Sequence, residues 1–380
     1  MTPPASSQHL LMTADTVGGV WTYASGLAQQ LAKLGWTITL VTLGPAPRRD
    51  QFLPLLSFPQ IDLEITDLEL DWQDPAGHDR QRALDYLASL EDRLRPDIVH
   101  ANGYRDACAG WRAPLVVAAH SCVGSWWRAC RGGAPVDASW EPYLADVAAG
   151  LEAADRWVAP TAAFHETITQ LYAPARRGEV IWNGIEPPDG AIPGDEPFIL
   201  AAGRLWDEAK NIGILQQIAG SLEWPVRIAG ATRHGDNAAP AAGSVEWLGD
   251  LPHAELLGVM RQAGIFVSPA VYEPFGLTAL EAAASGCALV LADIPTFREL
   301  WDGAALFIDA RNPSELQSAL AALTANTPLR RRLQQAALLR ARQYSLTAHT
   351  DAYERLYREM LVGSFRRVNA LRPSFAEAAA

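Results

Sequence analysis

The sequence predicts an α/β fold with two domains, each built on a doubly wound parallel sheet. With 380 residues, the chain exceeds the usual range of a single hydrophobic core. Short apolar segments alternate with helix-length amphipathic segments, which is typical of parallel strands joined by crossover helices. This alternation lapses near the middle of the chain and then restarts. A second domain of the same kind is therefore expected to follow the first.

The apolar segments are the expected strands. In the first half they lie at residues 9–15, 37–44, 98–103, 115–121, 157–161 and 180–184. In the second half they lie at residues 198–203, 226–230, 264–269, 287–293 and 305–309, with helices expected at 252–263 and 313–323. Pro and Gly gather at residues 186–195, which we interpret as a linker.

This linker divides the chain into two Rossmann-like domains, residues 1–187 and 188–362. An amphipathic helix is expected at residues 347–361, inside the second domain. Residues 363–380 form a tail, for which crossing back onto the N-terminal domain is one alternative.

Composition narrows the classes of protein. Hydrophobic residues make up 49% and charged residues 19%, which fits globular domains and not a disordered chain. The net charge of −12 is spread along the chain, so no nucleic-acid partner is expected. The four cysteines form no C-x-x-C pair and have no histidine at metal-ligand spacing, so neither zinc nor a disulfide framework is expected.

The sequence also bears on location. It has no signal peptide and no apolar run of the roughly 20 residues that would span a bilayer. We therefore expect a cytoplasmic protein, with association to a membrane surface left open. A monomer and a homodimer are both compatible with the sequence.

The segment from Glu273 to Glu281 carries the most information about function. Pro274 disfavours helical geometry at Glu273, so this carboxylate is expected on the loop at the carboxyl end of a strand, where open α/β sheets bind ligands. Gly276 permits close backbone approach, and the amides that follow it would open a helix and favour a diphosphate. Thr278 and Glu281 also fit a capping box that binds nothing. Glu273 has no such structural duty, which favours the functional interpretation.

The same segment resembles the hallmark of the retaining glycosyltransferase family 4, which has the two-domain GT-B architecture with a cleft between the domains. In that family two glutamates stand seven residues apart, usually as E-P-F-G-x-x-x-x-E. The resemblance implies that Glu273 contacts the hydroxyls of a donor sugar and that Glu281 holds the ribose of its nucleotide. It assigns the residues between them to donor binding: Phe275, Gly276, Leu277 and Thr278.

A second segment, with Arg204 and Lys210, resembles the family element that binds the donor diphosphate. Cations suit this role because fixed positive charges stabilise the charge that develops on the leaving diphosphate. The alternative for Arg204 is a surface ion pair with Asp207 or Glu208. Lys210 is one of only two lysines among 31 basic residues, which favours a role suited to a compact ammonium.

In the first half, Gly18 and Gly19 follow the first strand and resemble the glycine-rich first loop of the family, although a tight turn would look the same. His120 matches the cleft histidine of the family, near the reacting end of the donor sugar; the alternative is a hydrogen-bonded neighbour of the core. His100 and Asn102 resemble the family segment D-(I/V)-(V/I)-H-x-H, with Asn102 in place of its second histidine. That departure puts a direct role of this position in doubt.

Three further segments complete the resemblance. Gly230 and Leu248 lie in segments that resemble turns beside the nucleobase. The residues 125–128 and 131–133 follow His120, where acceptors bind in this family, although tryptophans more often only pack. Arg298 and Glu299 stand where Pro-Glu is usual, so a differently shaped pocket is expected.

Together these residues predict a hexosyltransferase. A sugar would move from a nucleotide-diphosphate sugar to an acceptor hydroxyl with retention, by a metal-independent front-face mechanism without a further cofactor. Arg204, Lys210, Glu273 and His120 are the expected catalytic residues. The acceptor could be a carbohydrate, a lipid-linked sugar or a small molecule. The alternatives are a sugar-nucleotide epimerase, a disaccharide phosphorylase or a non-catalytic nucleotide-sugar-binding subunit of the same architecture.

Overall fold

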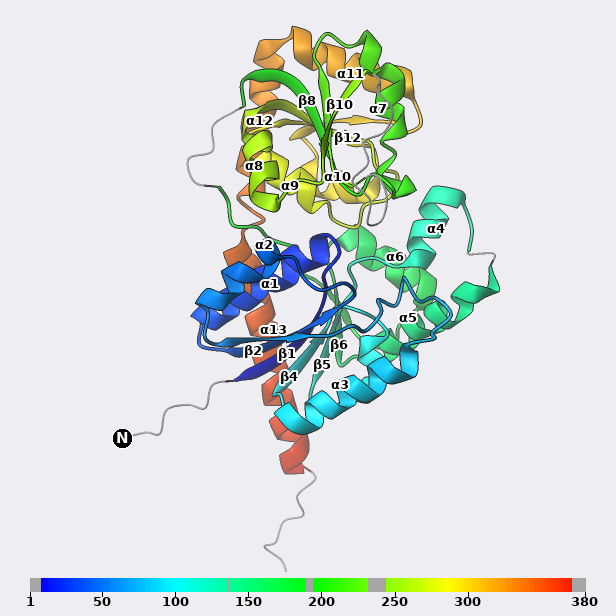
Figure 1. Ribbon diagram of the computed structural model, residues 1–380, viewed down its shortest axis with the longest axis vertical. Helices are drawn as coiled ribbons and strands as arrows, with labels where there is room; N and C mark the ends of the chain where they lie inside the picture. Colours follow the sequence, from blue (N-terminus) through cyan, green and yellow to red (C-terminus); the bar gives the residue numbers. More distant parts are fainter. Residues whose placement is uncertain (1–7, 135–136, 189–193, 232–243, 371–380) are drawn as a thin grey trace, which may run out of the picture.

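The computed structural model describes residues 8–134, 137–188, 194–231 and 244–370, which form two α/β domains (Figure 1). The N-terminal domain contains a seven-stranded parallel sheet in the order β3-β2-β1-β4-β5-β6-β7. Its strands are β1 (His9–Asp15), β2 (Thr37–Leu43), β3 (Ile61–Ile65), β4 (Ile98–Ala101), β5 (Leu115–Ala118), β6 (Arg156–Ala159) and β7 (Gly178–Val180).

Helices cover both faces of this sheet. They are α1 (Gly19–Lys33), α3 (Arg80–Leu94), α4 (Val123–Arg131), α5 (Glu141–Ala153) and α6 (Ala162–Tyr172), with a single turn at α2 (Arg49–Phe52). The helix α1 forms because apolar side chains recur every three or four residues and bury one stripe against the sheet, as Ala24, Leu27 and Leu31 do. Side chains from alternate positions of each strand pack on opposite faces, which produces two core layers.

The C-terminal domain contains a six-stranded parallel sheet in the order β10-β9-β8-β11-β12-β13. Its strands are β8 (Glu196–Ala202), β9 (Val226–Ala229), β10 (Val245–Gly249), β11 (Ala263–Ser268), β12 (Ala288–Ala292) and β13 (Ala305–Ile308). Its helices are α7 (Gly213–Ile218), α8 (His253–Gln262), α9 (Leu277–Ala284), α10 (Pro295–Trp301), α11 (Pro313–Ala325) and α12 (Thr327–Ala341). Every residue of β12 is buried, as expected for a central strand covered on both faces.

The last helix, α13 (Leu346–Ala370), crosses back to the N-terminal domain (Figure 1). Its side chains Tyr353, Leu356 and Tyr357 join the core layer formed by α1 and β1. The sequence analysis placed residues 347–361 in the C-terminal domain. The structure assigns them to the N-terminal core instead, because their apolar stripe completes the layer beside α1.

The two segments that connect the domains run side by side. Ile185 and Ser345 form a parallel β-bridge, in which the amide of Ile185 donates to the carbonyl of Tyr344 (3.1 Å) and the amide of Leu346 donates to the carbonyl of Ile185 (2.8 Å). Residues 189–193 of the expected linker and residues 371–380 of the tail lie outside the described residues.

The predicted fold class is confirmed, and two strands are additional. Both β3 and β10 are edge strands with partly exposed residues, so they lack the continuous apolar run of the central strands. The strand expected at residues 180–184 lies instead at Gly178–Val180. Within the part of the chain that the structure describes, no helix has both the length and the apolarity that crossing a membrane requires.

Candidate active site

The carboxyl ends of β8 and β11 bring together two residues that are 63 positions apart in the sequence. The ammonium of Lys210 donates to Oε2 of Glu273 at 2.5 Å. The side chains are only 17% and 16% exposed, so this ion pair is largely shielded from water. The lysine chain runs alongside Gly203, at the end of β8. The structure therefore places the predicted sugar-binding carboxylate directly on a predicted diphosphate-binding cation.

Beside this pair, α9 begins at Leu277 with Gly276 as its N-cap. Gly276 has φ +89, and a Cβ added there would lie 2.8 Å from Phe297 and 3.2 Å from Glu273. The turn therefore requires glycine, both for the left-handed backbone and for space. The helix start carries no side-chain cap, so its first amides remain available for an anion.

The capping-box alternative for Thr278 and Glu281 is wrong. Thr278 is the second residue of the helix and not its N-cap. The carboxylate of Glu281 instead accepts a hydrogen bond from Nε2 of His253 in α8 at 2.8 Å. This hydrogen bond, followed by attraction to Glu281 and Asp50, raises the pKa of His253. Glu281 is therefore a buried carboxylate that is hydrogen-bonded to a histidine of α8.

Arg204 follows β8 and faces the N-terminal domain. Its guanidinium pairs with Asp207 at 3.2 Å and lies 5.4 Å from the ring centre of Trp206. The ion pair considered from the sequence therefore forms, yet the arginine side chain stays 40% exposed. A Cβ added at Gly18 would lie 3.6 Å from Nη1 of Arg204. Arg204 therefore reaches both its own domain and the first loop of the other.

The Gly18–Gly19 loop lies against the C-terminal domain. Gly18 is the N-cap of α1 with φ +86, and a Cβ at Gly19 would lie 3.3 Å from Leu277 at the start of α9. Four predicted donor-binding residues from both domains are thus neighbours: Gly18, Gly19, Arg204 and Leu277.

Asp15 lies at the base of this loop, and the sequence analysis did not assign it to the site. Its carboxylate accepts hydrogen bonds from the amide of Val17 (2.6 Å) and from the indole of Trp72 (3.2 Å). Burial raises the pKa of Asp15 to about 7, against the lowering effect of these two donors and of Arg204. The available signal was a carboxylate that ends a strand at the ligand-binding edge.

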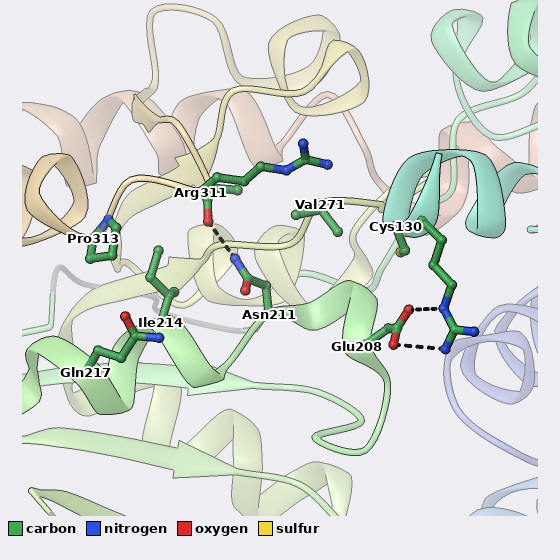
Figure 2. A pocket seen from close by; sticks show the side chains of 10 residues that line it. Cys130, Glu208, Asn211, Ile214, Gln217, Val271, Arg311 and Pro313 are labelled. Atoms are coloured by element: carbon green, nitrogen blue, oxygen red, sulfur yellow. Dashed lines mark hydrogen bonds and ion pairs between the residues drawn. The ribbon is translucent and has the colours of Figure 1, made fainter. Parts of the chain in front are cut away.

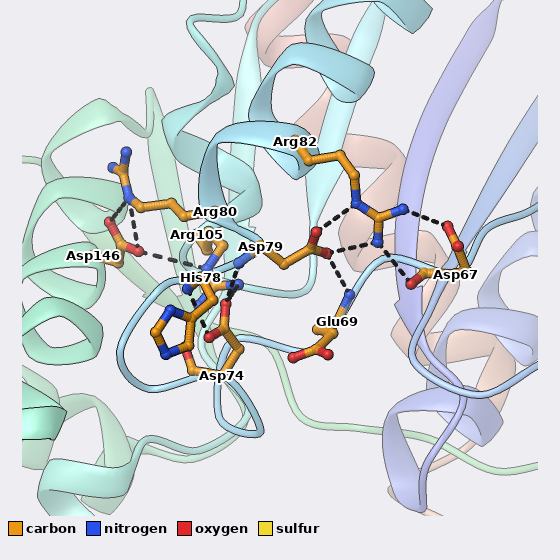
Figure 3. Close-up of polar contacts among 9 residues, drawn as sticks. All are labelled: Asp67, Glu69, Asp74, His78, Asp79, Arg80, Arg82, Arg105 and Asp146. Carbon is orange, nitrogen blue, oxygen red and sulfur yellow. Dashed lines mark hydrogen bonds and ion pairs between the residues drawn. The ribbon is translucent and has the colours of Figure 1, made fainter.

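Trp72 lies in the loop of residues 67–79, which a network of ion pairs holds in place (Figure 3). Arg105 is buried and pairs with Asp74 at 3.1 Å and with Asp146 of α5 at 3.6 Å. Arg80, in the first turn of α3, also pairs with Asp146 at 2.8 Å. This network fixes the loop from which Trp72 contacts Asp15, and the indole ring of Trp72 stacks on Trp206 of the other domain with centres 6.3 Å apart.

His120 and His100 have different environments. His120 follows β5, is partly exposed, and its Nε2 lies 2.7 Å from Oδ1 of Asn102. Burial, with the neighbouring imidazole of His349, lowers the pKa of His120 to about 3. His100 is fully buried between the hydroxyls of Tyr23 and Tyr357, so it is a core residue.

The tryptophan segment after His120 contacts the other domain. The indole of Trp126 donates to Oδ1 of Asp207 at 2.9 Å. Because Oδ2 of the same carboxylate accepts from Arg204, Asp207 links α4 to a predicted catalytic residue. Nearby, Arg131 forms a two-pronged ion pair with Glu208 at 2.8 and 3.1 Å. The acceptor contact considered for this segment is not tested by these interactions.

A pocket of about 520 Å³ lies beside the Arg131–Glu208 pair (Figure 2). Its wall comes from α4, α7 and the segments after β8, β11 and β13. Its described lining is Cys130, Arg131, Glu208, Asn211, Ile214, Gln217, Val271, Ala310, Arg311 and Pro313. None of the predicted catalytic or donor-binding residues belongs to this lining, although Asn211 directly follows Lys210.

Glu299, which follows Arg298 in the segment where Pro-Glu is usual in the family, also joins the domains. Its two carboxylate oxygens accept from the amides of Ala162 and Ala163, at 2.9 and 2.8 Å, and one of them also accepts from the indole of Trp182 at 3.2 Å. A carboxylate is favourable at this position because the first amides of α6 have no helical acceptor. No sequence signal marks this contact, since its two sides lie 137 residues apart.

The two residues expected beside the nucleobase lie on the β9–β10 side of β8, and Gly230 lies against Gly203, the glycine beside which the Lys210 chain runs. Gly230 follows β9 with φ +133, and any side chain there would meet the carbonyl oxygen of Gly203. Leu248 lies in β10 and packs on the core beneath α8 and α9. Within residues 8–134, 137–188, 194–231 and 244–370, no group of three or more His, Cys, Asp or Glu residues could hold a metal ion.

Comparison with known proteins agrees with this arrangement. The model for Glycosyltransferase Family 4 matches residues 17–188, and the model for Glycosyl transferases group 1 matches residues 184–340. Glycogen synthase of Mycobacterium tuberculosis is 27% identical over 329 residues, which cover 73% of this chain and 75% of that protein. D-inositol 3-phosphate glycosyltransferase of Corynebacterium jeikeium is 35% identical over 118 residues, which cover 30% of this chain and only 28% of that protein.

Solved structures show the same fold. Sucrose-phosphate synthase of Thermosynechococcus elongatus superposes with a TM-score of 0.77 at 17% identity, covering 94% of this chain and all of that chain. HepE of Anabaena, solved with UDP-glucose, superposes with a TM-score of 0.71 at 16% identity, covering 93% of this chain and 99% of that chain. The two facing parallel-sheet domains define a glycosyltransferase of the GT-B type. Within that class, the chain belongs to glycosyltransferase family 4.

Proposed function

We propose that this protein transfers a hexose from a nucleotide-diphosphate sugar to an acceptor hydroxyl with retention of the anomeric configuration. The observation that carries the proposal is the contact of Lys210 with Glu273 beside the uncapped start of α9. A sugar-binding carboxylate, a cation and free helix amides then lie at one edge of the sheet. Arg204 and the Gly18–Gly19 loop approach the same edge from both domains.

In this proposal, the donor diphosphate binds the first amides of α9 and the side chains of Arg204 and Lys210. Glu273 accepts from hydroxyls of the donor sugar, and Glu281 accepts from the ribose. The bond from the anomeric carbon to the diphosphate breaks while the acceptor oxygen bonds to that carbon on the same face. The leaving phosphate oxygen takes the acceptor proton. The two cations stabilise the charge on the diphosphate, and the reaction needs no metal ion.

A binding screen followed by a transfer assay tests the proposal. UDP-glucose is the first donor to try because HepE was solved with it. UDP, ADP and GDP are compared by thermal shift, and the right nucleotide at about 100 times its Kd should stabilise the protein by about 2.7 kcal/mol. Transfer is then measured with the matching donor and a panel of acceptors, with and without EDTA. We expect unchanged rates in EDTA and a product with the donor's anomeric configuration, so an inverted product would refute retention.

The same reagents separate the alternatives. An epimerase would convert the nucleotide-sugar with no acceptor present, and a disaccharide phosphorylase would release a sugar phosphate from a disaccharide and inorganic phosphate. A non-catalytic subunit would bind the donor and transfer nothing to any acceptor. The proposed transferase converts donor only when acceptor is added, apart from slow hydrolysis.

A further inference from the structure

Asn102 replaces the second histidine of the family segment, and its side chain has a fixed orientation in the structure. It follows β4, where its backbone amide donates to Oγ1 of Thr13 at 3.0 Å. Its side-chain Nδ2 donates to the carbonyl oxygen of Thr13 at 2.6 Å. A carbonyl oxygen can only accept, so the amide group of Asn102 cannot be rotated without losing this bond. The side-chain Oδ1 therefore faces His120.

This orientation determines which nitrogen of His120 carries the proton. Oδ1 of Asn102 lies 2.7 Å from Nε2 of His120 and can only accept. Nε2 must therefore hold the proton, and in a neutral ring Nδ1 is then an acceptor. Among the described residues, no group hydrogen-bonds to Nδ1 of His120. His120 as a residue is partly exposed, and Nδ1 has no hydrogen-bond partner among the described residues that would compete with a ligand.

The surroundings of His120 keep its ring neutral. The titratable groups that face it are Tyr23 of α1, whose ring packs edge-on at 4.4 Å, His100 of β4 and His349 of α13. None of these groups is an anion at neutral pH, and burial together with His349 lowers the pKa of His120 to about 3. His349 donates from Nδ1 to the carbonyl of Trp182 at 2.8 Å, and burial lowers its pKa to about 4, so its ring is neutral and its Nε2 carries no proton at neutral pH.

We infer that Asn102 is a positioning residue that holds His120 as a neutral hydrogen-bond acceptor, with Nδ1 presented to a hydroxyl of the donor sugar or of the acceptor. The inference rests on the proposed function for the identity of that hydroxyl. It assigns His120 to substrate positioning and excludes it as the acid that would protonate the leaving phosphate. The amide of Asn102 thus decides what His120 can do in the reaction.

Nitrogen-15 NMR of histidine-labelled protein tests the proton assignment without any substrate. The His120 signals are those that disappear in His120→Asn. In the wild type we expect the Nε2–H tautomer, with no titration between about pH 4.5 and about pH 8. In Asn102→Ala the ring should stay neutral but populate both tautomers. Asn102→Asp should raise the pKa of His120 by about one to three pH units, because it adds an anion to the same nitrogen. A protonated Nδ1 or a wild-type titration near pH 6.5 would overturn the inference.

A pH profile of sugar transfer tests the consequence for the reaction. In the wild type His120 stays neutral between about pH 4.5 and about pH 8, so its titration should leave no step in the pH profile of kcat over this range. In Asn102→Asp, kcat should fall on the acid side, at the pH where NMR shows that His120 takes up its second proton. An unchanged profile in this variant, with a titrating His120, would refute the role of the neutral ring. Absence of any transfer by the wild type would instead count against the proposed function and leave the NMR result intact.

Discussion

Lys210 shows how a single residue can serve two purposes at this site. Without a ligand, its ammonium neutralises Glu273 and keeps a largely buried carboxylate paired. With a donor bound, the same ammonium would turn to the diphosphate and leave Glu273 to the sugar hydroxyls. A compact cation on a flexible stem suits such an exchange better than the rigid fork of arginine.

Removal of this cation should impair catalysis, and it should also destabilise the fold because it leaves the largely buried carboxylate of Glu273 without its partner. We expect Lys210→Ala or Arg204→Ala to lower kcat/KM by about 10²–10³-fold, because each removes a fixed charge from the developing diphosphate. Lys210→Arg should restore only part of the loss. Initial-rate measurements check this, with Arg311→Ala as the control, since Arg311 is an exposed arginine outside the predicted site residues. Wild-type turnover in both Lys210→Ala and Arg204→Ala would refute their assignment.

Substitutions of Glu281 and Glu273 should have different effects on nucleotide binding. Glu281→Ala should weaken the binding of free nucleotide, because Glu281 is expected to hold the ribose, whereas Glu273→Ala should chiefly slow sugar transfer. Isothermal titration calorimetry with the nucleoside diphosphate that binds the wild type distinguishes them. Equal nucleotide affinity in the wild type and Glu281→Ala would leave Glu281 only its structural bond to His253.

The His253–Glu281 pair also predicts a pH dependence of stability. Because the folded state raises the pKa of His253 above 6.5, the pair contributes fully below that value and is lost as the pH rises through the raised pKa. His253 is 51% exposed, so the contribution should stay below about 1 kcal/mol. Urea unfolding at about pH 6 and about pH 8 should show a larger advantage of wild type over His253→Gln at the lower pH. An equal difference in the free energy of unfolding at the two pH values would contradict a raised pKa of His253.

At the scale of elements, the start of α9 depends on the shape of one turn. Gly276 has φ +89 and is also enclosed by Phe297 and Glu273. Gly303 offers a matched comparison, because it has φ +79 and nothing within 4 Å of the position of a Cβ. Both positions impose a left-handed backbone, but only the first lacks space.

Alanine at these two positions should therefore have different costs. Gly303→Ala should lower the free energy of unfolding by about 1–2 kcal/mol, the cost of the left-handed conformation alone. Gly276→Ala should cost more and should also reduce nucleotide binding, because the first amides of α9 must move. Urea unfolding and calorimetry measure the two effects. If both variants lose the same free energy of unfolding and Gly276→Ala binds nucleotide normally, the turn at Gly276 can accept a side chain and the prediction is wrong.

How well each strand could be predicted from the sequence depends on its place in the sheet. The central strands were predictable because continuous apolar runs such as β12 mark strands covered on both faces. The edge strands β3 and β10 were not, because their partly polar pattern blends with the loops. In the site, Glu273, Lys210 and Arg204 stand in local motifs. The contacts of Asp207 with Trp126 and of Glu299 with Ala162 form only when the two domains meet, and no spacing within either segment encodes that meeting.

At the scale of the whole molecule, contacts between the domains reach a predicted catalytic residue. Asp207 accepts from Trp126 of the N-terminal domain and from Arg204 of its own domain. The Arg131–Glu208 pair also joins α4 to the segment after β8, but it does not contact Arg204. Domain closure and the orientation of Arg204 should therefore be coupled through Asp207.

Two conservative substitutions test that coupling. Trp126→Phe removes one N–H donor and keeps an aromatic ring, so it should lower kcat/KM because Asp207 no longer links Arg204 to the N-terminal domain. Glu208→Gln weakens an exposed ion pair of the same interface, 48% exposed on each side, and should change kcat/KM little. Steady-state kinetics with the donor decide between them. A similar loss in both variants would indicate that the interface matters only as a whole.

The return of α13 to the N-terminal domain has a consequence for the order in which the molecule can form during synthesis. When the first domain leaves the ribosome, one hydrophobic face of its sheet is not yet covered by Tyr353, Leu356 and Tyr357 of α13. Its core closes only after the second domain has been translated, so the two cannot mature as fully independent units. Ribosome-bound chains that stop before Leu346 should therefore expose this face to proteases, and chains whose residues through Met360 have left the ribosome should protect it.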